Sequence, residues 1–193
     1  MKQGKRTMKH GKRKLAVIAV IAIVLTLFAQ GTVAYFSHVG KATNVVTSGN
    51  IQFIIHETTN GGGLFPSNGV VVLPGDVVEK KVTFESDCTH PFYLRAKLTY
   101  AVNDTTLTAA DCFAPDINTT DWEYHDGWYY YKAIVEPGKT TTELLSDVTI
   151  VGDKVDNAYI GKKLTLSVVA QAVQSEHNPL TDGHTYTALG WPA

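Results

Sequence analysis

The sequence lacks the local signatures of the common catalytic and metal-binding sites. It has no G-x-S-x-G motif for a serine nucleophile, no H-E-x-x-H zinc helix and no C-x-x-C pair. The histidines after residue 34 are scattered, with no two spaced four residues apart: His38, His56, His90, His125, His177 and His184. We therefore expect neither a catalytic residue nor a metal or other cofactor.

Long apolar runs are also missing, with one short exception near the N-terminus. Residues 15–29 are an apolar run of about fifteen residues, whereas a membrane-spanning helix needs about 20. A head with seven basic residues and no acidic one precedes this run, at 1–14. This is the pattern of a secretory signal, and the small residues Thr32 and Ala34 predict cleavage after Ala34, with Tyr35 as the mature N-terminus. An uncleaved membrane anchor is the alternative.

Basic residues become scarce once the predicted signal peptide, residues 1–34, is removed. Seven of the 17 Lys and Arg residues lie in it, which leaves 10 against 18 Asp and Glu and a net charge of about −8. Affinity for nucleic acid depends on neutralising phosphates, so we expect no nucleic-acid partner. The remainder has the length of one domain, which we place at 51–193 after a flexible segment at 35–50.

Cysteine is equally sparse. The chain has two, Cys88 and Cys112, and both lie in the part that is expected to be exported. In an oxidising compartment an even pair predicts one disulfide, closing a loop worth about 3 kcal/mol in the chain-entropy model. Two unpaired thiols are the alternative.

What the sequence has in quantity is period-two alternation. Alternating apolar and polar residues at 50–57, 79–86, 92–102 and 164–174 predict half-buried strands. Turn signals separate the strands: "NGGG" at 60–63, "LPGD" at 73–76, "EPGK" at 136–139 and "VGDK" at 151–154. Only 105–114 is expected to supply a short helix. We predict an all-β protein, a single antiparallel jelly roll or β-sandwich.

The segment between residues 98 and 131 is acidic. It contains six Asp or Glu residues and no Lys or Arg. Carboxylates in the loop at 103–127 could bind calcium. The segment has no D-x-D-x-D-G pattern, and a solvated acidic loop is the simpler interpretation.

Aromatic residues gather in the same part of the chain. Trp122, Tyr124, Trp128 and Tyr130 are candidates for contact with a sugar or protein ligand. In a strand Trp128 and Tyr130 face one side while Tyr129 faces the other, so half of this cluster must pack within the sheet.

Five segments, in order, resemble the TasA/camelysin family of Gram-positive bacteria. They are "GTVAYFSHVGKATNVVTSGNIQFIIHE", "VLPGDVVEKKVTFES", "FYLRAKL", "DGWYYYKAIVEPGKTT" and "LTLSVVAQAVQSEH" with a closing "ALGW". The resemblance spans almost all of the chain after Leu15; the loop around Cys112 and the long basic head depart from it. It implies a secreted jelly-roll protein, processed by a signal peptidase of the SipW type, whose relatives form biofilm-matrix fibres.

The resemblance and the residues together predict a structural role. We expect an extracellular fibre or matrix subunit that self-associates at the cell surface, with other matrix proteins or glycans as further partners. A surface adhesin that binds through the aromatic residues is the second hypothesis. A camelysin-like metalloprotease is the third, and no zinc ligand set of that family can be matched in this sequence.

The segment at 35–50 supplies the expected mechanism of assembly. It carries apolar residues between polar ones and glycines, and we expect cleavage to free it as a donor strand for a neighbouring subunit. A head-to-tail contact of this kind generates filaments when it does not close into a ring. A merely disordered terminus is the alternative. The candidate donor residues are Tyr35, Phe36, Val39, Val45 and Val46.

Overall fold

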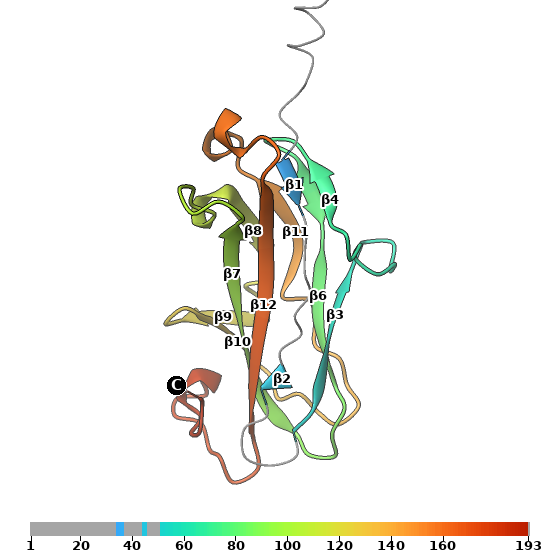
Figure 1. The fold of residues 1–193 in the computed structure, drawn as a ribbon. Helices are drawn as coiled ribbons and strands as arrows, with labels where there is room; N and C mark the ends of the chain where they lie inside the picture. The colour runs from blue at the N-terminus through green and yellow to red at the C-terminus, as the bar shows by residue number, and fades with distance from the viewer. Residues whose placement is uncertain (1–33, 37–43, 46–50, 193) are drawn as a thin grey trace, which may run out of the picture.

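The computed structural model describes residues 34–36, 44–45 and 51–192. Apart from Ala34, the predicted signal peptide lies outside these residues, as do Val39 and Val46 of the predicted donor strand. Within the described ranges no helix is long and apolar enough to cross a bilayer. These residues form an all-β protein whose strands are mostly antiparallel, which confirms the predicted fold class (Figure 1).

Four of the described strands, β3, β6, β7 and β12, coincide with the four segments in which alternation was predicted. The bounds of the described strands are β1 Ala34–Phe36, β2 Asn44–Val45, β3 Phe53–Thr58, β4 Val70–Val72, β5 Val77–Glu79, β6 Lys81–Ser86, β7 Phe92–Val102, β8 Phe113–Ile117, β9 Trp122–His125, β10 Trp128–Tyr131, β11 Leu145–Ile150 and β12 Lys163–Gln174. The predicted short helix is a single 3-10 turn, Ala110–Cys112. Further 3-10 turns are Gly152–Lys154, Asn157–Tyr159 and Thr185–Thr187.

The main sheet is built around two long strands. β7 and β12 pair antiparallel along their whole common length, from Leu164 opposite Val102 to Gln174 opposite Phe92. The strand order of the sheet is β4-β1-β12-β7-β10-β9, with β2 also paired to β12. Long cross-strand pairing fixes the register, because a slip by one residue would move every apolar side chain to the opposite face.

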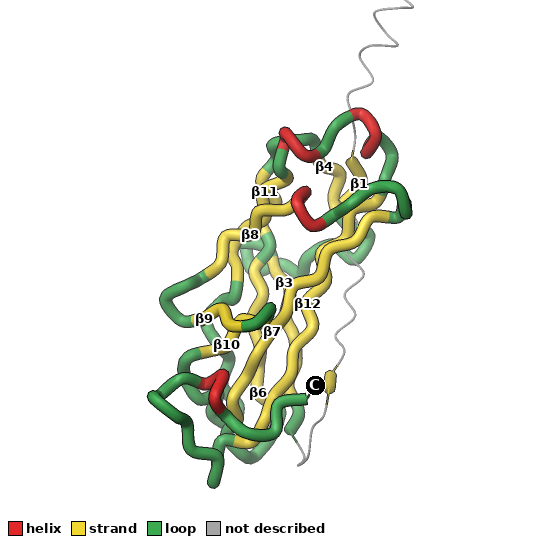
Figure 2. Tube along the Cα trace, turned by 90° about the vertical axis from the view of Figure 1, so that its left-hand side faces the viewer, coloured by secondary structure: helices red, strands yellow, loops and turns green. Residues whose placement is uncertain are grey.

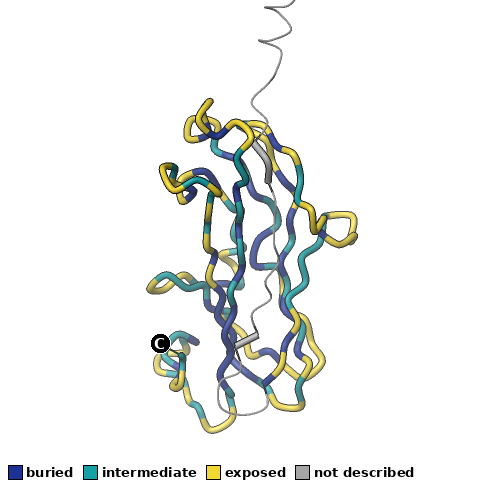
Figure 3. Tube along the Cα trace, viewed as in Figure 1, coloured by how far each residue is buried: buried dark blue, intermediate teal, exposed yellow. Residues whose placement is uncertain are grey.

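Two smaller sheets complete the core. β5, β11 and β8 form one, and β3 with β6 forms the other. Backbone hydrogen bonds from Thr141 and Leu144 to Phe84 and Val82 tie the segment before β11 to β6. The buried side chains of all three sheets form one apolar cluster between them. Figure 3 colours the buried stretches of the chain dark blue.

The outer face of β7 differs from the prediction near the start of the strand. Tyr93 and Arg95, which the alternation places toward solvent, are both buried. The C-terminal segment, residues 175–192, crosses this end of the main sheet (Figure 2). Tyr93, Val173 and Ala188 form a second small apolar cluster there. The alternation of β7 therefore identifies its inner face, but it does not predict that the C-terminal segment buries part of its outer face.

The β9–β10 hairpin has a two-residue turn. His125 pairs with Trp128 across it, and the turn residues are Asp126 and Gly127, both with positive φ (47° and 83°). This is the type I′ geometry that suits the right-handed twist of paired strands, and Asp-Gly is a favoured sequence for it. The tight turn holds the aromatic residues of the hairpin in register, and β9 is an edge strand of the main sheet because β10 is its only partner among the described strands.

Candidate functional site

The N-terminal strand β1 lies between two strands of the domain. It pairs in parallel with β12, Tyr35 opposite Lys163, and antiparallel with β4, Tyr35 opposite Val71. Farther along the same strand, β2 pairs in parallel with β12 at Ala170 and Gln171. The predicted donor segment thus adds to the sheet within its own chain, and β1 joins β4 to β12.

The four candidate aromatic residues do not form a flat binding face. Trp122 is only 1% exposed, and its ring packs on Phe84 and on Tyr131. Tyr130 is buried as well. Trp128 lies against the guanidinium group of Arg95, 4.1 Å from the ring centroid. Aromatic residues on both faces of the hairpin are therefore packed against other side chains, whereas the alternation had predicted packing for only half of them.

Tyr124 is the exception among these four residues. It is 64% exposed, and its ring contacts Tyr129 at a centroid distance of 5.1 Å. It stands at the rim of the cavity described below, so it remains free to contact a ligand.

Arg95 anchors the C-terminal segment to the outer face of the sheet. Its Nε and Nη2 donate to Gln171 Oε1, and its Nη1 donates to the Tyr130 hydroxyl. Nη2 also donates to the Pro192 carbonyl, and the guanidinium lies 4.9 Å from the Trp191 ring centroid. A planar guanidinium can stack on aromatic rings and donate from its edge at the same time, which a lysine cannot. Arg95 therefore acts as a structural clamp.

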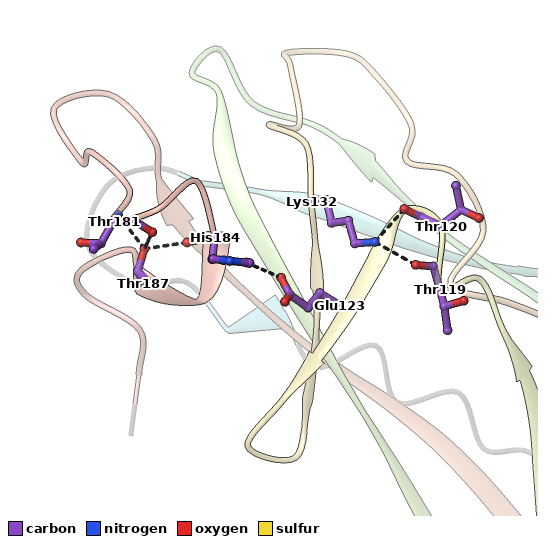
Figure 4. Close-up of polar contacts among 7 residues, drawn as sticks. All are labelled: Thr119, Thr120, Glu123, Lys132, Thr181, His184 and Thr187. Atoms are coloured by element: carbon purple, nitrogen blue, oxygen red, sulfur yellow. Dashed lines mark hydrogen bonds and ion pairs between the residues drawn. The ribbon is translucent and has the colours of Figure 1, made fainter.

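A cavity of about 490 Å³ lies between the edge strand β9 and the C-terminal segment. His184 Nδ1 and Glu123 Oε2 are 2.9 Å apart at this position, and they join the segment to β9 (Figure 4). Nearby, Lys132 Nζ donates to the carbonyls of Thr119 and Thr120, each at 2.8 Å (Figure 4). Hydrogen bonds and an ion pair therefore hold several of the residues that line the cavity in place.

Aromatic stacking gives the C-terminal wall of this cavity further support. The Tyr186 ring lies between two histidine rings, 4.0 Å from His125 and 4.8 Å from His184. Glu123 and His184 are far apart in the sequence, and no local pattern brings them together. Neither His184 nor Lys132 was among the predicted site residues for that reason.

The two cysteines are not paired. Cys88 and Cys112 are both free thiols, so the predicted disulfide is absent from this structure. Cys88 lies just before β7, and Cys112 lies beyond its far end in the 3-10 turn that packs on it. A strand rises about 3.3 Å per residue, so the length of β7 keeps the two thiols far beyond the reach of a disulfide. Cys112 is buried, and burial raises the pKa of its thiol.

The acidic loop is held by local contacts. Asp104 accepts hydrogen bonds from Lys162 Nζ, at 2.7 Å, and from Thr106. The bond from Lys162, followed by those from Thr106, holds the pKa of Asp104 well below its usual range. No three side chains of the types that bind metals come together within residues 51–192. The described residues thus offer no group that favours a calcium site or the metalloprotease hypothesis.

The buried charge of Lys80 was not predicted from the sequence. The Lys80 side chain is fully buried, with Nζ 3.0 Å from Glu57 Oε1 and 4.2 Å from the Phe65 ring centroid. Burial lowers the pKa of Lys80, and the Glu57 carboxylate partly offsets this. The sequence carried one indication of this burial: Lys80 lies two residues before the buried Val82, and residues two apart in a strand face the same side. The contacts fix the loop that carries Phe65, and we assign Lys80 a structural role.

Comparisons with protein families, with curated proteins and with solved structures gave no match. The resemblance to the TasA/camelysin family therefore stays a prediction. Two features of the described residues bear on function: the position of β1 between β4 and β12, and the cavity beside β9.

Proposed function

We propose that this chain is a secreted structural subunit that assembles into extracellular fibres by exchanging its N-terminal strand. The observation that supports this is the position of β1, paired with β12 on one side and with β4 on the other. This is the place that a strand from a neighbouring subunit would occupy. The proposal includes a jelly-roll or β-sandwich fold, a cleaved signal peptide and a role in the matrix or at the cell surface of a Gram-positive bacterium.

Strand exchange is physically favoured because β1 of a neighbouring subunit can make the same backbone hydrogen bonds to β4 and β12 as the chain's own β1. When β1 leaves, β4 and β12 each lose hydrogen-bond partners along the edge that it covered, and buried unpaired backbone groups are costly. A copy of the same strand from a neighbour restores the same bonds, which is why exchanging an identical element is a low-cost route to assembly. Each subunit then donates at one place and accepts at another, so the contact is head-to-tail and propagates.

Before cleavage the apolar run at 15–29 would hold the donor segment at the membrane. Cleavage after Ala34 would place the new N-terminus at the first residues of β1. Processing by a SipW-type peptidase would therefore control assembly, because only the cleaved chain can offer its strand to another subunit. Family resemblance and strand position support the same segment independently.

The test is deletion of residues 35–46 from the mature protein. We expect the truncated domain to fold and to remain monomeric by light scattering, and to form no fibres in electron micrographs. Added peptide 35–48 should bind the truncated domain, and it should end the growth of fibres formed by the intact protein. A peptide of the same composition in scrambled order is the control. Fibres formed as readily by the truncated domain would contradict the proposal.

The cavity beside β9 favours a second candidate function, that of an adhesin. Tyr124 is exposed at its rim, and polar side chains line its walls. Adhesion and assembly would use opposite edges of the main sheet, β9 and β4, so one protein can perform both.

A further inference from the structure

The loop between β3 and β4 contains two asparagines that directly precede glycine, at Asn60–Gly61 and Asn68–Gly69. Such an asparagine can lose its side-chain amide without an enzyme, because the backbone nitrogen of the next residue attacks the side-chain carbonyl and glycine has no side chain to obstruct the attack. Both asparagines are exposed, and both follow a hydroxyl residue, Thr59 or Ser67. The local sequences are therefore closely matched, and any large difference in reactivity must come from the fold.

Asn60 and Gly61 form the tip of the hairpin loop that follows β3. The N–H of Gly62 donates to the Thr59 carbonyl at 2.9 Å, and Gly62 has a positive φ of 78°. This matches the hairpin loop in which a type I turn is followed by a glycine in the left-handed region. The N–H of Gly61 takes no part in closing the turn and has no hydrogen-bond acceptor among the described residues. The nitrogen that must attack Asn60 is therefore not held by the fold.

Asn68 lies in a turn that holds the equivalent nitrogen. The N–H of Gly69 donates to the Pro66 carbonyl at 2.9 Å, so the attacking atom of this pair is the donor that closes the turn. Gly69 is also half-buried, directly before β4. Attack on Asn68 requires that hydrogen bond to open first, which adds the cost of the bond to the reaction.

The surroundings of Asn60 leave room for the reaction. Three glycines follow it, Gly61, Gly62 and Gly63, and glycine changes its backbone angles at little steric cost. Apart from the chain neighbours, a Cβ on Gly61 would meet only the Thr59 hydroxyl oxygen, at 3.9 Å, and a Cβ on Gly62 would meet nothing within 4 Å. No described residue therefore blocks the rotation that brings the Gly61 nitrogen to the Asn60 side chain.

We propose that Asn60 is a site of spontaneous deamidation in the folded protein and that Asn68 is protected by its turn. The Gly61 nitrogen loses its proton and bonds to the side-chain carbonyl carbon of Asn60. The side-chain amide nitrogen leaves as ammonia, and a cyclic succinimide results. Water then opens the succinimide at either carbonyl and gives aspartate or isoaspartate. Both products add a negative charge, and isoaspartate also adds a carbon atom to the backbone.

The added backbone carbon of isoaspartate disturbs the pairing that the hairpin loop sets. Thr58 forms a bridge with Leu64 across the loop, and the N–H of Phe65 donates to the Glu57 carbonyl at 2.9 Å. A longer backbone does not fit this register, so the pairing at Leu64 and Phe65 loosens. The Phe65 ring lies 4.2 Å from Lys80 Nζ, so the change reaches the contact that covers the buried lysine. This inference is independent of strand exchange through β1.

The experiment is incubation of the purified protein in neutral buffer, followed by mass spectrometry of chymotryptic peptides. Chymotrypsin can cut after Leu64, between the two sites. In the folded protein we expect Asn60 to convert about five- to tenfold faster than Asn68, the ratio that one closing hydrogen bond gives. In urea, where the turns are lost, the two sites should convert at similar rates.

Two variants test the attacking nitrogen. Gly61→Ala should slow conversion of Asn60, because the added methyl group obstructs the nitrogen, and the variant should fold because Gly61 does not have a positive φ. Gly63→Ala is the matched control and should convert as the wild type does, since its Cβ meets only the Thr59 hydroxyl oxygen at an ordinary 3.6 Å. Hydrogen exchange at Leu64 and Phe65 should be faster in the isoaspartate form than in the unconverted protein.

Three results would overturn the proposal. The first is conversion of Asn60 no faster than that of Asn68 in the folded protein. The second is conversion of Gly61→Ala at the rate of the Gly63→Ala control. The third is a difference between the two sites that persists undiminished in urea, because the local sequence and not the fold would then be its cause.

Discussion

The two faces of the β7–β12 strand pair are buried in different ways. The inner face carries Leu94 and Leu166, which pack into one apolar cluster with the two smaller sheets. Among the described residues, the outer face of β7 is buried only near its start, where Arg95 holds the C-terminal segment through hydrogen bonds and ring contacts. The comparison teaches that the inner face provides the stability of the whole domain, while the outer face provides a local attachment.

The largest effect should come from the inner face. Phe84 is fully buried and contacts the rings of Phe53 and Trp122. Replacing it by alanine leaves a cavity among three sheets, and we expect Phe84→Ala to lower the free energy of unfolding by about 3–5 kcal/mol. Urea denaturation measures this. Thr99→Ala, on the exposed part of the outer face, should change it by less than about 0.5 kcal/mol. Equal losses in the two variants would remove the distinction between the faces.

A smaller and more local effect is expected at Arg95. Arg95→Ala removes the stacking and hydrogen bonds that hold Trp191 and Pro192, at a cost of about 2 kcal/mol. Hydrogen exchange should rise in residues 185–192 and stay slow in β12. Arg95→Lys keeps the charge but not the planar fork, so it should restore only part of the protection. Unchanged exchange in the C-terminal segment of Arg95→Ala would show that Arg95 is not its anchor.

These expectations also mark how much the sequence could predict. Period-two alternation identified the inner faces of β6, β7 and β12, because the inner face of a strand can be recognised from the apolar residues that recur at every second position of that strand. It failed at Tyr93 and Arg95, since the segment that covers them is irregular and comes some 80 residues later along the chain. A pattern within one strand carries no information about such a partner.

The candidate sites follow the same rule. The N-terminal segment was predicted from its composition and position to add as a strand to a neighbouring subunit, and the structure pairs its β1 strand with β4 and β12 of the same chain. The cavity was not predicted, because Glu123 and His184 are brought together by the docking of the C-terminal segment. The disulfide was predicted from cysteine count and compartment alone, neither of which measures the separation imposed by β7.

Tyr100 on the inner face should produce a smaller, pH-dependent effect. Burial, with a lesser contribution from Tyr129, raises the pKa of Tyr100 from 10.0 to about 12. Between these values the folded state keeps a proton that the unfolded state has lost, so this residue makes stability fall as pH rises from 10 toward 12. Tyr100→Phe should lessen that fall when unfolding is measured against pH. An identical alkaline slope in the variant would contradict the assignment.

The reactivity of the two thiols should distinguish the exposed start of β7 from the inner cluster, without any change in stability. Cys88 is partly exposed beside the start of β7, whereas Cys112 is buried in the inner cluster and has a raised pKa. Iodoacetamide should label Cys88 in the folded protein and Cys112 only after unfolding, because the thiolate is the reactive form and needs access. Mass spectrometry of the labelled peptides resolves the two. Equal labelling of both thiols under native conditions would place Cys112 outside the core.

The central claim, strand exchange through β1, is tested most directly by a cross-link between Tyr35 and Val71. These residues are directly opposite each other on β1 and β4, where Cα atoms lie about 4.5–5.5 Å apart, a separation that a disulfide can bridge. The variant Tyr35→Cys/Val71→Cys is made with Cys88→Ser and Cys112→Ala, and its control carries Tyr35→Cys with Tyr124→Cys on β9, an exposed position at the opposite edge of the main sheet. Oxidised monomers should form an intramolecular bond and run as monomers on non-reducing gels. Oxidised fibres should instead give a ladder of covalent multimers that the control lacks. Fibres whose Tyr35–Val71 bonds all remain within single chains would contradict the account.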